Sequence, residues 1–349
     1  MQRFLLILLG ILCPIILQAQ SLIGELDFAF RFDNREYANT RLAPSDTYFG
    51  ITAAPRLGWS WQQGHSLMIG ADLLKRFGKP EPAIESAWLL YYQFENEDFQ
   101  TQAGIFPRNK QTGDYPNAFF DELQFFDTAI EGLRLNWNYH PNGKIEFITD
   151  WTGCKWEATR ESFRIYAYGC QTFGNFYIAF PFLMHHYANS DYVRGVVDNI
   201  WIYPHAGWFF EEYNLDLRFG WLKTFQNDRR QGKGYLNPGG IQIEVTYQWH
   251  SLGVHNTLYL GKNLLPYYET TDEAGIAYAD LLYLGNPFYR TEKGVYDQLE
   301  LFWAPKISKS VQLKIRSIHH FSREKGGWQQ LVSLFIPLHG SVTPAAFQR

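Results

Sequence analysis

The residues best suited to hold a metal ion or to act as a base are two pairs of adjacent histidines, His185-His186 and His319-His320. Successive side chains of a β-strand point to opposite faces, so neither pair can bind one ion from within a regular strand. The sequence also contains no HExxH, GxSxG or P-loop motif. We therefore expect no metal site, no cofactor and no enzymatic activity.

Polar and apolar side chains alternate along many segments of the chain, as they do in β-strands. Residues 22–33 place one set on each face of a strand: Leu26, Phe28, Phe30 and Phe32 against Glu25, Asp27, Arg31 and Asp33. Residues 240–250 repeat the pattern, with Ile241, Ile243, Val245, Tyr247 and Trp249 against Gln242, Glu244, Thr246 and Gln248. A face with a charge at almost every second position suits a water-filled lumen lined by both signs.

About sixteen such strands can be traced along the chain, and their connections alternate in length. Short links near residues 63, 97, 142, 174, 211, 251 and 306 alternate with long ones. Outer-membrane barrels have short periplasmic turns and longer outer loops, whereas a soluble sandwich has no reason for strict alternation. The sequence therefore predicts an all-β protein, a closed antiparallel transmembrane barrel. Pro55 falls within a strand and cannot donate to a ladder, so we expect a bulge there.

Tryptophans mark one end of the predicted strands. Six of them fall on the apolar face at the lower ends of descending strands: Trp59, Trp61, Trp137, Trp208, Trp249 and Trp303. This common depth predicts an aromatic girdle at one membrane interface. Core tryptophans of a sandwich are the alternative, but a core would not require them at one end.

The N-terminus has the pattern of a secretory signal peptide, with Arg3 before the apolar residues 4–17 and a small residue, Ala19, for cleavage. We assign residues 1–19 to this peptide and residues 20–349 to one barrel domain. The formal charge of −4 gives no support for nucleic-acid binding.

Two cysteines, Cys154 and Cys170, remain in the mature chain. They fall near opposite ends of one hairpin arm, about 25 Å apart at roughly 3.3 Å per residue. A disulfide needs Cα atoms within about 7 Å, so we predict two free thiols.

The chain resembles Gram-negative outer-membrane porins. The most specific match is the sequence from Ala103 to Arg108 at the end of the fifth strand, followed by an insertion, Asn109–Thr128, and by Glu131–Leu135 entering the sixth. In porins the third long loop, after the fifth strand, folds into the barrel and narrows it. The resemblance implies the same role for residues 108–130, location in the outer membrane, and possible assembly as a trimer.

A porin would admit small hydrophilic solutes by passive diffusion, with selectivity set by charges at its narrowest point. The insertion would supply Arg108, Lys110, Asp114, Asp121, Glu122 and Asp127. The facing wall would supply Arg31, Arg56, Arg134, Arg164, Arg218, Lys314 and Arg316. The alternative for these charges is a set of ordinary solvated ion pairs.

Three further alternatives concern the whole barrel and its longest loop. A non-conducting barrel could act as the scaffold of a surface complex. A serine-histidine lipid hydrolase in the barrel wall is also open, because such a site has little sequence signature. The tyrosines of the loop 262–294 could bind sugars or cap the barrel mouth, and capping is favoured.

Overall fold

The computed structural model describes residues 21–342, except residues 63, 79–83, 121–124, 141, 155–158, 191–194, 272–283 and 324. The assigned signal peptide lies outside these described residues. The chain is 71% β-strand. The first nine strands are β1 (Ser21–Glu36), β2 (Asp46–Trp61), β3 (His65–Arg76), β4 (Glu85–Glu95), β5 (Phe99–Pro107), β6 (Ala129–His140), β7 (Gly143–Gly153), β8 (Thr159–Phe173) and β9 (Phe176–Ser190).

The second half continues the same sheet. Its strands are β10 (Val196–Ile202), β11 (His205–Phe210), β12 (Leu215–Asp228), β13 (Gly239–Trp249), β14 (Leu252–Gly261), β15 (Val295–Trp303), β16 (Lys306–Ser308), β17 (Val311–Ser322) and β18 (Gly327–Val342). The described connections include the short 3-10 helices η1 (Arg108–Lys110), η3 (Glu211–Tyr213), η4 (Arg229–Gln231) and η5 (Pro287–Arg290). Among the described residues, no helix is long and apolar enough to cross a membrane.

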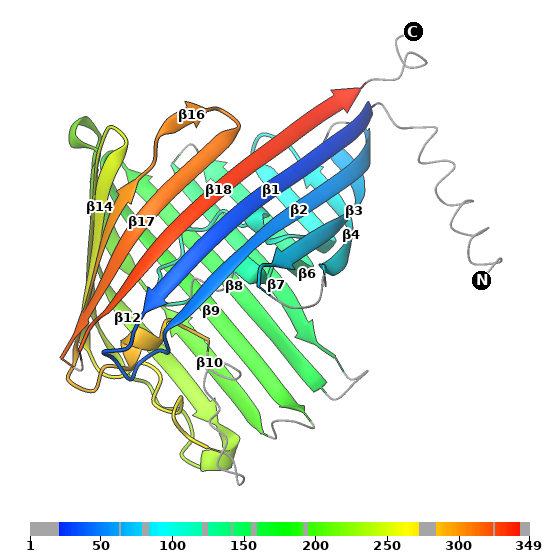
Figure 1. Cartoon of the computed structure of the whole chain (residues 1–349). Helices are drawn as coiled ribbons and strands as arrows, with labels where there is room; N and C mark the ends of the chain where they lie inside the picture. The colour runs from blue at the N-terminus through cyan, green and yellow to red at the C-terminus, as the bar shows by residue number, and fades with distance from the viewer. Residues whose placement is uncertain are drawn as a thin grey trace.

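The sheet is antiparallel and closes on itself, because β1 pairs with β18 along its whole length. Figure 1 shows these two strands, blue and red, side by side. Two of the crossings consist of two segments each. Both β10 and β11 lie between β9 and β12, and both β15 and β16 pair with β17. The molecule is therefore a closed barrel of sixteen strands, as the sequence predicts.

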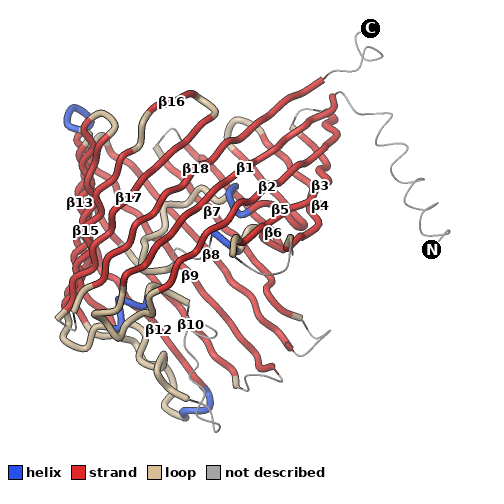
Figure 2. The backbone as a smooth tube through the Cα atoms, in the orientation of Figure 1, coloured by secondary structure: helices blue, strands red, loops and turns tan. Residues whose placement is uncertain are grey.

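The two ends of the barrel differ in their connections. Tight turns join the strands at one end, and the long connections gather at the other, where tan loops project downward in Figure 2. By the rule for outer-membrane barrels, the long-loop end is the outer end. This orientation tells which side chains of the wall lie near the outer surface of the membrane and which lie near its inner surface.

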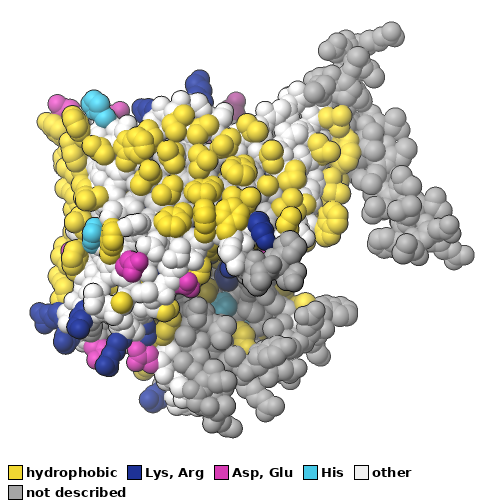
Figure 3. Space-filling view, in the orientation of Figure 1, with side chains coloured by type: hydrophobic (Ala, Val, Ile, Leu, Met, Phe, Trp, Pro, Cys, Tyr) yellow, Lys and Arg dark blue, Asp and Glu magenta, His cyan; other side chains and the backbone are white. Residues whose placement is uncertain are grey.

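The outer surface of the barrel carries a belt of hydrophobic side chains (Figure 3). The belt follows from strand alternation, since side chains such as Leu57 and Trp88 are exposed on the outer face, 67% and 78%, while polar partners such as Arg56 are buried inside. In water such exposure would be costly, but it matches the hydrocarbon of a bilayer.

Two details of the wall differ from the sequence prediction. No bulge occurs at Pro55, because the register between β2 and each neighbour is the same before and after it. Gly70 of β3, which is paired with Arg56, leaves room for the Pro55 carbonyl, so the chain passes without an extra residue. The alternation of residues 199–209 indicates one continuous strand, but the structure interrupts it between Ile202 and His205.

Candidate functional site

The insertion after β5 lies inside the barrel and crosses its lumen. Its first part is anchored on β7, where the Glu146 carboxylate accepts hydrogen bonds from the Thr112 and Gly113 backbone at 2.8 and 2.7 Å. Further along, Asp114 pairs with Arg218 of β12 at 2.7 Å. Asn117 then donates to Gln298 of β15 at 2.7 Å. These contacts place the insertion across the inside of the barrel, between β7, β12 and β15.

Charged residues of the insertion face charged residues of the wall. Asp127 lies 2.5 Å from Arg164 and 3.0 Å from Arg108, which also pairs with Asp150 of β7. Burial favours a raised pKa for Asp127, but the two arginines outweigh it and lower the pKa. Lys110 approaches Glu25 at 3.5 Å. The two remaining acidic residues of the predicted set, Asp121 and Glu122, lie outside the described residues.

The basic residues predicted for the pore wall all lie on strands that line the lumen. Most pair with carboxylates there: Arg56 with Glu25 and Asp27, Arg134 with Glu146, Arg218 with Asp114 and Asp216, and both Lys314 and Arg316 with Glu300. Arg31 lies over the Phe125 ring, 5.4 Å from its centroid. Each charge is thus matched locally, so the wall presents few free cations to a passing solute.

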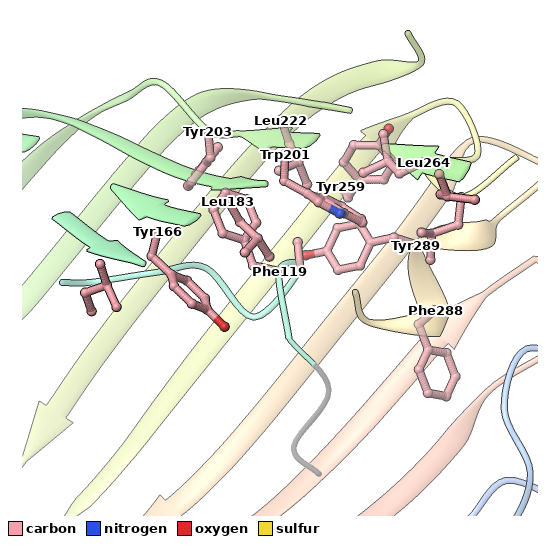
Figure 4. Packing of buried hydrophobic residues seen from close by; sticks show 14 of the residues in the cluster. Phe119, Tyr166, Leu183, Trp201, Tyr203, Leu222, Tyr259, Leu264, Phe288 and Tyr289 are labelled. Atoms are coloured by element: carbon pink, nitrogen blue, oxygen red, sulfur yellow. The ribbon is translucent and has the colours of Figure 1, made fainter. Parts of the chain in front are cut away.

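Aromatic side chains fill much of the space that the ion pairs leave. Figure 4 shows Phe119 of the insertion among Trp201, Tyr166 and Tyr289, all of which are buried. Tyr289 comes from the loop 262–294 and donates to Gln242 of β13 at 2.8 Å. Beside this cluster a cavity of about 590 Å³ remains, lined by charged residues of β1 and of the insertion. Two loops therefore enter the barrel, and together they obstruct it.

The adjacent histidines point to opposite sides of the wall, as expected for a strand. His185 is buried inside, whereas His186 belongs to the outer face. Likewise His320 stacks on Phe288 inside the barrel, with ring centroids 3.9 Å apart, whereas His319 stacks on Trp328 outside. Within the part of the chain that the structure describes, no three potential metal-ligating side chains cluster.

His186 forms a histidine-carboxylate pair on the membrane-facing side of the barrel. Its Nδ1 lies 2.7 Å from Oδ1 of Asp198, which is directly opposite on β10. Both side chains are largely covered, with 16% and 8% exposed. With a proton on Nδ1 shared with the carboxylate, Nε2 is left with a free lone pair. The pair lies near the end of β9 from which the chain continues to β10. This is the end of the barrel where the long connections gather, so the pair is at the outer side of the membrane.

The surroundings of this pair are aromatic. The Phe163 ring stacks on His186 with centroids 5.0 Å apart, and Trp151 stacks on Phe163 at 5.5 Å. The Tyr235 hydroxyl donates to the other carboxylate oxygen of Asp198 at 3.1 Å. Burial and the charge of Asp198 raise the pKa of Tyr235, so it stays a donor at neutral pH. These contacts fix the carboxylate and the imidazole in one orientation.

A second group on the outer wall brings a hydroxyl and an imidazole together. The Ser317 Oγ lies 3.1 Å from Nε2 of His319 and accepts a hydrogen bond from Trp328 Nε1 at 2.9 Å. No carboxylate contacts the His319 ring among the described residues. Of the two adjacent histidine pairs, the outward member of one thus contacts a carboxylate and the outward member of the other contacts a hydroxyl.

The predicted aromatic girdle has its side chains on the outer surface. Trp137, Trp208, Trp249 and Trp303 are 43–60% exposed, and Trp59 and Trp61 are half-buried. All lie towards the short-turn end of their strands. Neither Cys154 nor Cys170 forms a disulfide, as predicted.

The model of a protein family described as lipid A 3'-O-deacylase-type matches residues 18–343. No curated protein matches the sequence. Among solved structures, the chain is similar to the outer membrane protein OpdK from Pseudomonas aeruginosa, with a TM-score of 0.50 and 10% identity, covering 91% of this chain and 99% of that one. It is also similar to a loop-deletion mutant of OmpT, an outer membrane protein of Vibrio cholerae, with a TM-score of 0.55 and 7% identity, covering 91% and 100%.

These comparisons confirm one prediction and overturn another. The outer-membrane barrel predicted from the sequence is confirmed, and its relation to porins is one of fold. The prediction that the chain is not an enzyme is wrong, because the matching family is one of enzymes. The sequence did hold a signal: His186 and Asp198 are polar exceptions on the outer face of two consecutive strands. Strand parity alone identifies such exceptions.

Proposed function

The chain belongs to the lipid A 3'-O-deacylase-type family, and we propose that it hydrolyses an acyl ester of an outer-leaflet lipid at the His186–Asp198 pair. The observation that carries this proposal is the place of the pair. It lies on the lipid-facing side of the wall and near the outer end. The ester groups of an outer-leaflet lipid lie just below its headgroup, at the height where such a pair can reach them.

The chemistry follows from the known roles of a histidine and a carboxylate in acyl transfer. Asp198 holds the imidazole in the tautomer that leaves Nε2 free, and its charge stabilises the imidazolium formed when Nε2 takes a proton. General-base catalysis of this kind accelerates a reaction about 10²–10⁴-fold. In the wall, aromatic rings exclude water from part of the pair, which strengthens its electrostatic interactions.

The attacking group is the part of the mechanism that differs from a serine triad. The next residue on the outer face of β9 is Ala188, and no described hydroxyl contacts His186. We propose direct attack by water. His186 removes a proton as the water oxygen bonds to the ester carbon, and it returns that proton to the leaving alcohol oxygen. The products are a free fatty acid and a lipid with one hydroxyl restored.

The test is fatty-acid release from purified lipid A by the full chain in detergent. His186→Asn should lower the rate about 10²-fold or more. His319→Asn is the matched control, since it removes the outward histidine of the second adjacent pair and should leave the rate unchanged. Ser190, the last residue of β9, provides a further variant. A loss of fatty-acid release in Ser190→Ala would identify serine, rather than water, as the nucleophile. No release by the unmodified chain would overturn the proposal.

A second candidate function is passive diffusion of small hydrophilic solutes through the lumen. The cavity of about 590 Å³ beside the insertion favours it, whereas the buried aromatic cluster opposes it. In this proposal, the paired charges of the insertion and the wall form the constriction. Single-channel conductance should then rise when residues 109–128 are deleted. Absence of conductance in both forms would exclude diffusion and leave the hydrolase untouched.

A further inference from the structure

A buried carboxylate of β3, Asp72, lies inside the barrel without a cation of its own. Its side chain belongs to the inner face and is 4% exposed. The Thr128 side chain, at the end of the insertion, forms a hydrogen bond with it. In the part of the chain that the structure describes, no salt bridge joins Asp72 to a lysine, an arginine or a histidine. A buried charge is costly unless an opposite charge compensates it, so this carboxylate is suited to receive a cation.

Asp27 of β1 is a second carboxylate in the same row of the wall. It pairs with Ala54 of β2, and the register between β2 and β3 places Ala54 opposite Asp72. Since only the small side chain of Ala54 separates them, the two carboxylates repel each other. Asp27 lies 2.8 Å from Arg56, so the charge of Asp27 is compensated and that of Asp72 is not.

Cations are fewer than carboxylates in this part of the wall. Arg56 also lies 2.7 Å from Glu25, which Lys110 approaches at 3.5 Å. His339 is 3.8 Å from Glu25 and adds no charge when its ring is neutral. Two cations thus serve three carboxylates: Glu25, Asp27 and Asp72. One negative charge is left over.

The uncompensated charge borders the cavity of about 590 Å³ inside the barrel. Asp72 lines this cavity from the wall, Phe120 and Phe125 line it from the insertion, and Phe288 lines it from η5. Pockets for small organic ligands measure about 300–1,000 Å³. The face of an aromatic ring attracts a cation. The cavity therefore combines a carboxylate that lacks an ion pair with aromatic rings, in a space large enough for a small organic molecule.

We propose that this cavity binds a small organic cation, an amine with an aromatic or other apolar part, whose ammonium group pairs with Asp72. The ammonium group completes the ion pair that the wall lacks, by a hydrogen bond in which both partners are charged. A neutral solute of the same shape leaves the carboxylate uncompensated, and an anion meets a like charge. The inference requires neither ester hydrolysis nor diffusion, because it concerns binding inside the barrel, whereas His186 lies on the outer face.

The test is isothermal titration calorimetry of the full refolded chain in a nonionic detergent. Its three probes share a benzene ring and differ in charge: benzylamine, benzyl alcohol and benzoate. Benzylamine should bind about tenfold more tightly than benzyl alcohol, because a hydrogen bond between charged groups is the stronger one, and benzoate should not bind. Asp72→Asn keeps the size of the side chain and removes its charge. It should lower the affinity for benzylamine to that for benzyl alcohol.

Asp98→Asn is the matched control, since this carboxylate is exposed in a turn at the opposite end of the barrel. It should keep the full preference for benzylamine. Equal binding of benzylamine and benzyl alcohol by the unmodified chain would overturn the inference, and this comparison needs no variant. An unchanged preference in Asp72→Asn would overturn it as well. Fatty-acid release is measured on the same preparations, so a failure of the proposed hydrolysis is seen separately from a failure of amine binding.

Discussion

At the scale of the residue, the barrel wall places two adjacent histidines in different environments. His185 is buried inside the barrel, and His186 lies within hydrogen-bond distance of Asp198 on the outside. One position along a strand thus decides whether an imidazole meets the lumen or the membrane. Only the outer one can meet an acyl ester of a membrane lipid.

The charge of the Asp198 carboxylate can be tested separately from the size of its side chain. Asp198→Asn keeps the size of the side chain but removes the charge that stabilises the imidazolium. We expect kcat for ester hydrolysis to fall about 10²–10⁴-fold with KM little changed. A rise in KM at unchanged kcat would instead mean that Asp198 serves substrate binding.

The sequence predicted the opposite directions of the paired histidines but not their partners. Alternation along a strand is a local property and can be read from spacing. The contact between His186 and Asp198 depends on the register between β9 and β10. The sequence alone does not define the length of the polar connection between these two strands, so it does not predict their register. The prediction of no enzymatic activity was wrong because a site built from residues of two different strands has no continuous sequence motif.

At the scale of the element, the insertion after β5 depends on one buried carboxylate. Glu146 is fully buried and accepts hydrogen bonds from the Thr112 hydroxyl and from Arg134 Nε, at 2.8 and 3.1 Å, in addition to two backbone amides. Removing one partner of a buried pair leaves the other charge uncompensated. The insertion is therefore held by charge as well as by packing.

Glu146→Gln should lower the free energy of unfolding by about 3–5 kcal/mol, because Arg134 loses its buried partner. Urea titration of the refolded barrel, followed by tryptophan fluorescence, measures this change. Glu211→Gln is the control, since that carboxylate is exposed at the short-turn end. Equal midpoints for the two variants would contradict the anchoring role.

The elements were predicted well where the pattern is periodic and less well where it is interrupted. The insertion was placed by its position after the fifth strand. The break between β10 and β11 was missed, because residues 203–204 separate two segments that share one alternation. Pro55 was expected to cause a bulge, and a glycine on the neighbouring strand made it unnecessary.

At the scale of the whole molecule, closure removes every free sheet edge and turns an apolar surface towards lipid. β1 and β18 pair from Leu22 to Glu36, so the first and last strands complete the ring. The alternation of long and short connections was enough to predict this closure from the sequence. The filling of the lumen by two loops was beyond such a prediction, because side-chain packing inside the barrel is not periodic.

Closure predicts resistance to detergent. Unheated protein in dodecyl sulfate should keep its sheet and migrate differently from boiled protein on a gel. The His186→Asn and His319→Asn variants should show the same shift, since both side chains lie on the outer wall. Identical mobility before and after boiling would argue against a closed barrel.

The measurement that tests the central claim most directly is the mass of lipid A extracted from Gram-negative cells that express the chain in their outer membrane. The account predicts a species lighter by one ester-linked acyl chain with the unmodified chain, and its absence with His186→Asn at equal expression. The same lighter species in both, or in neither, would contradict an acyl-ester hydrolase centred on His186.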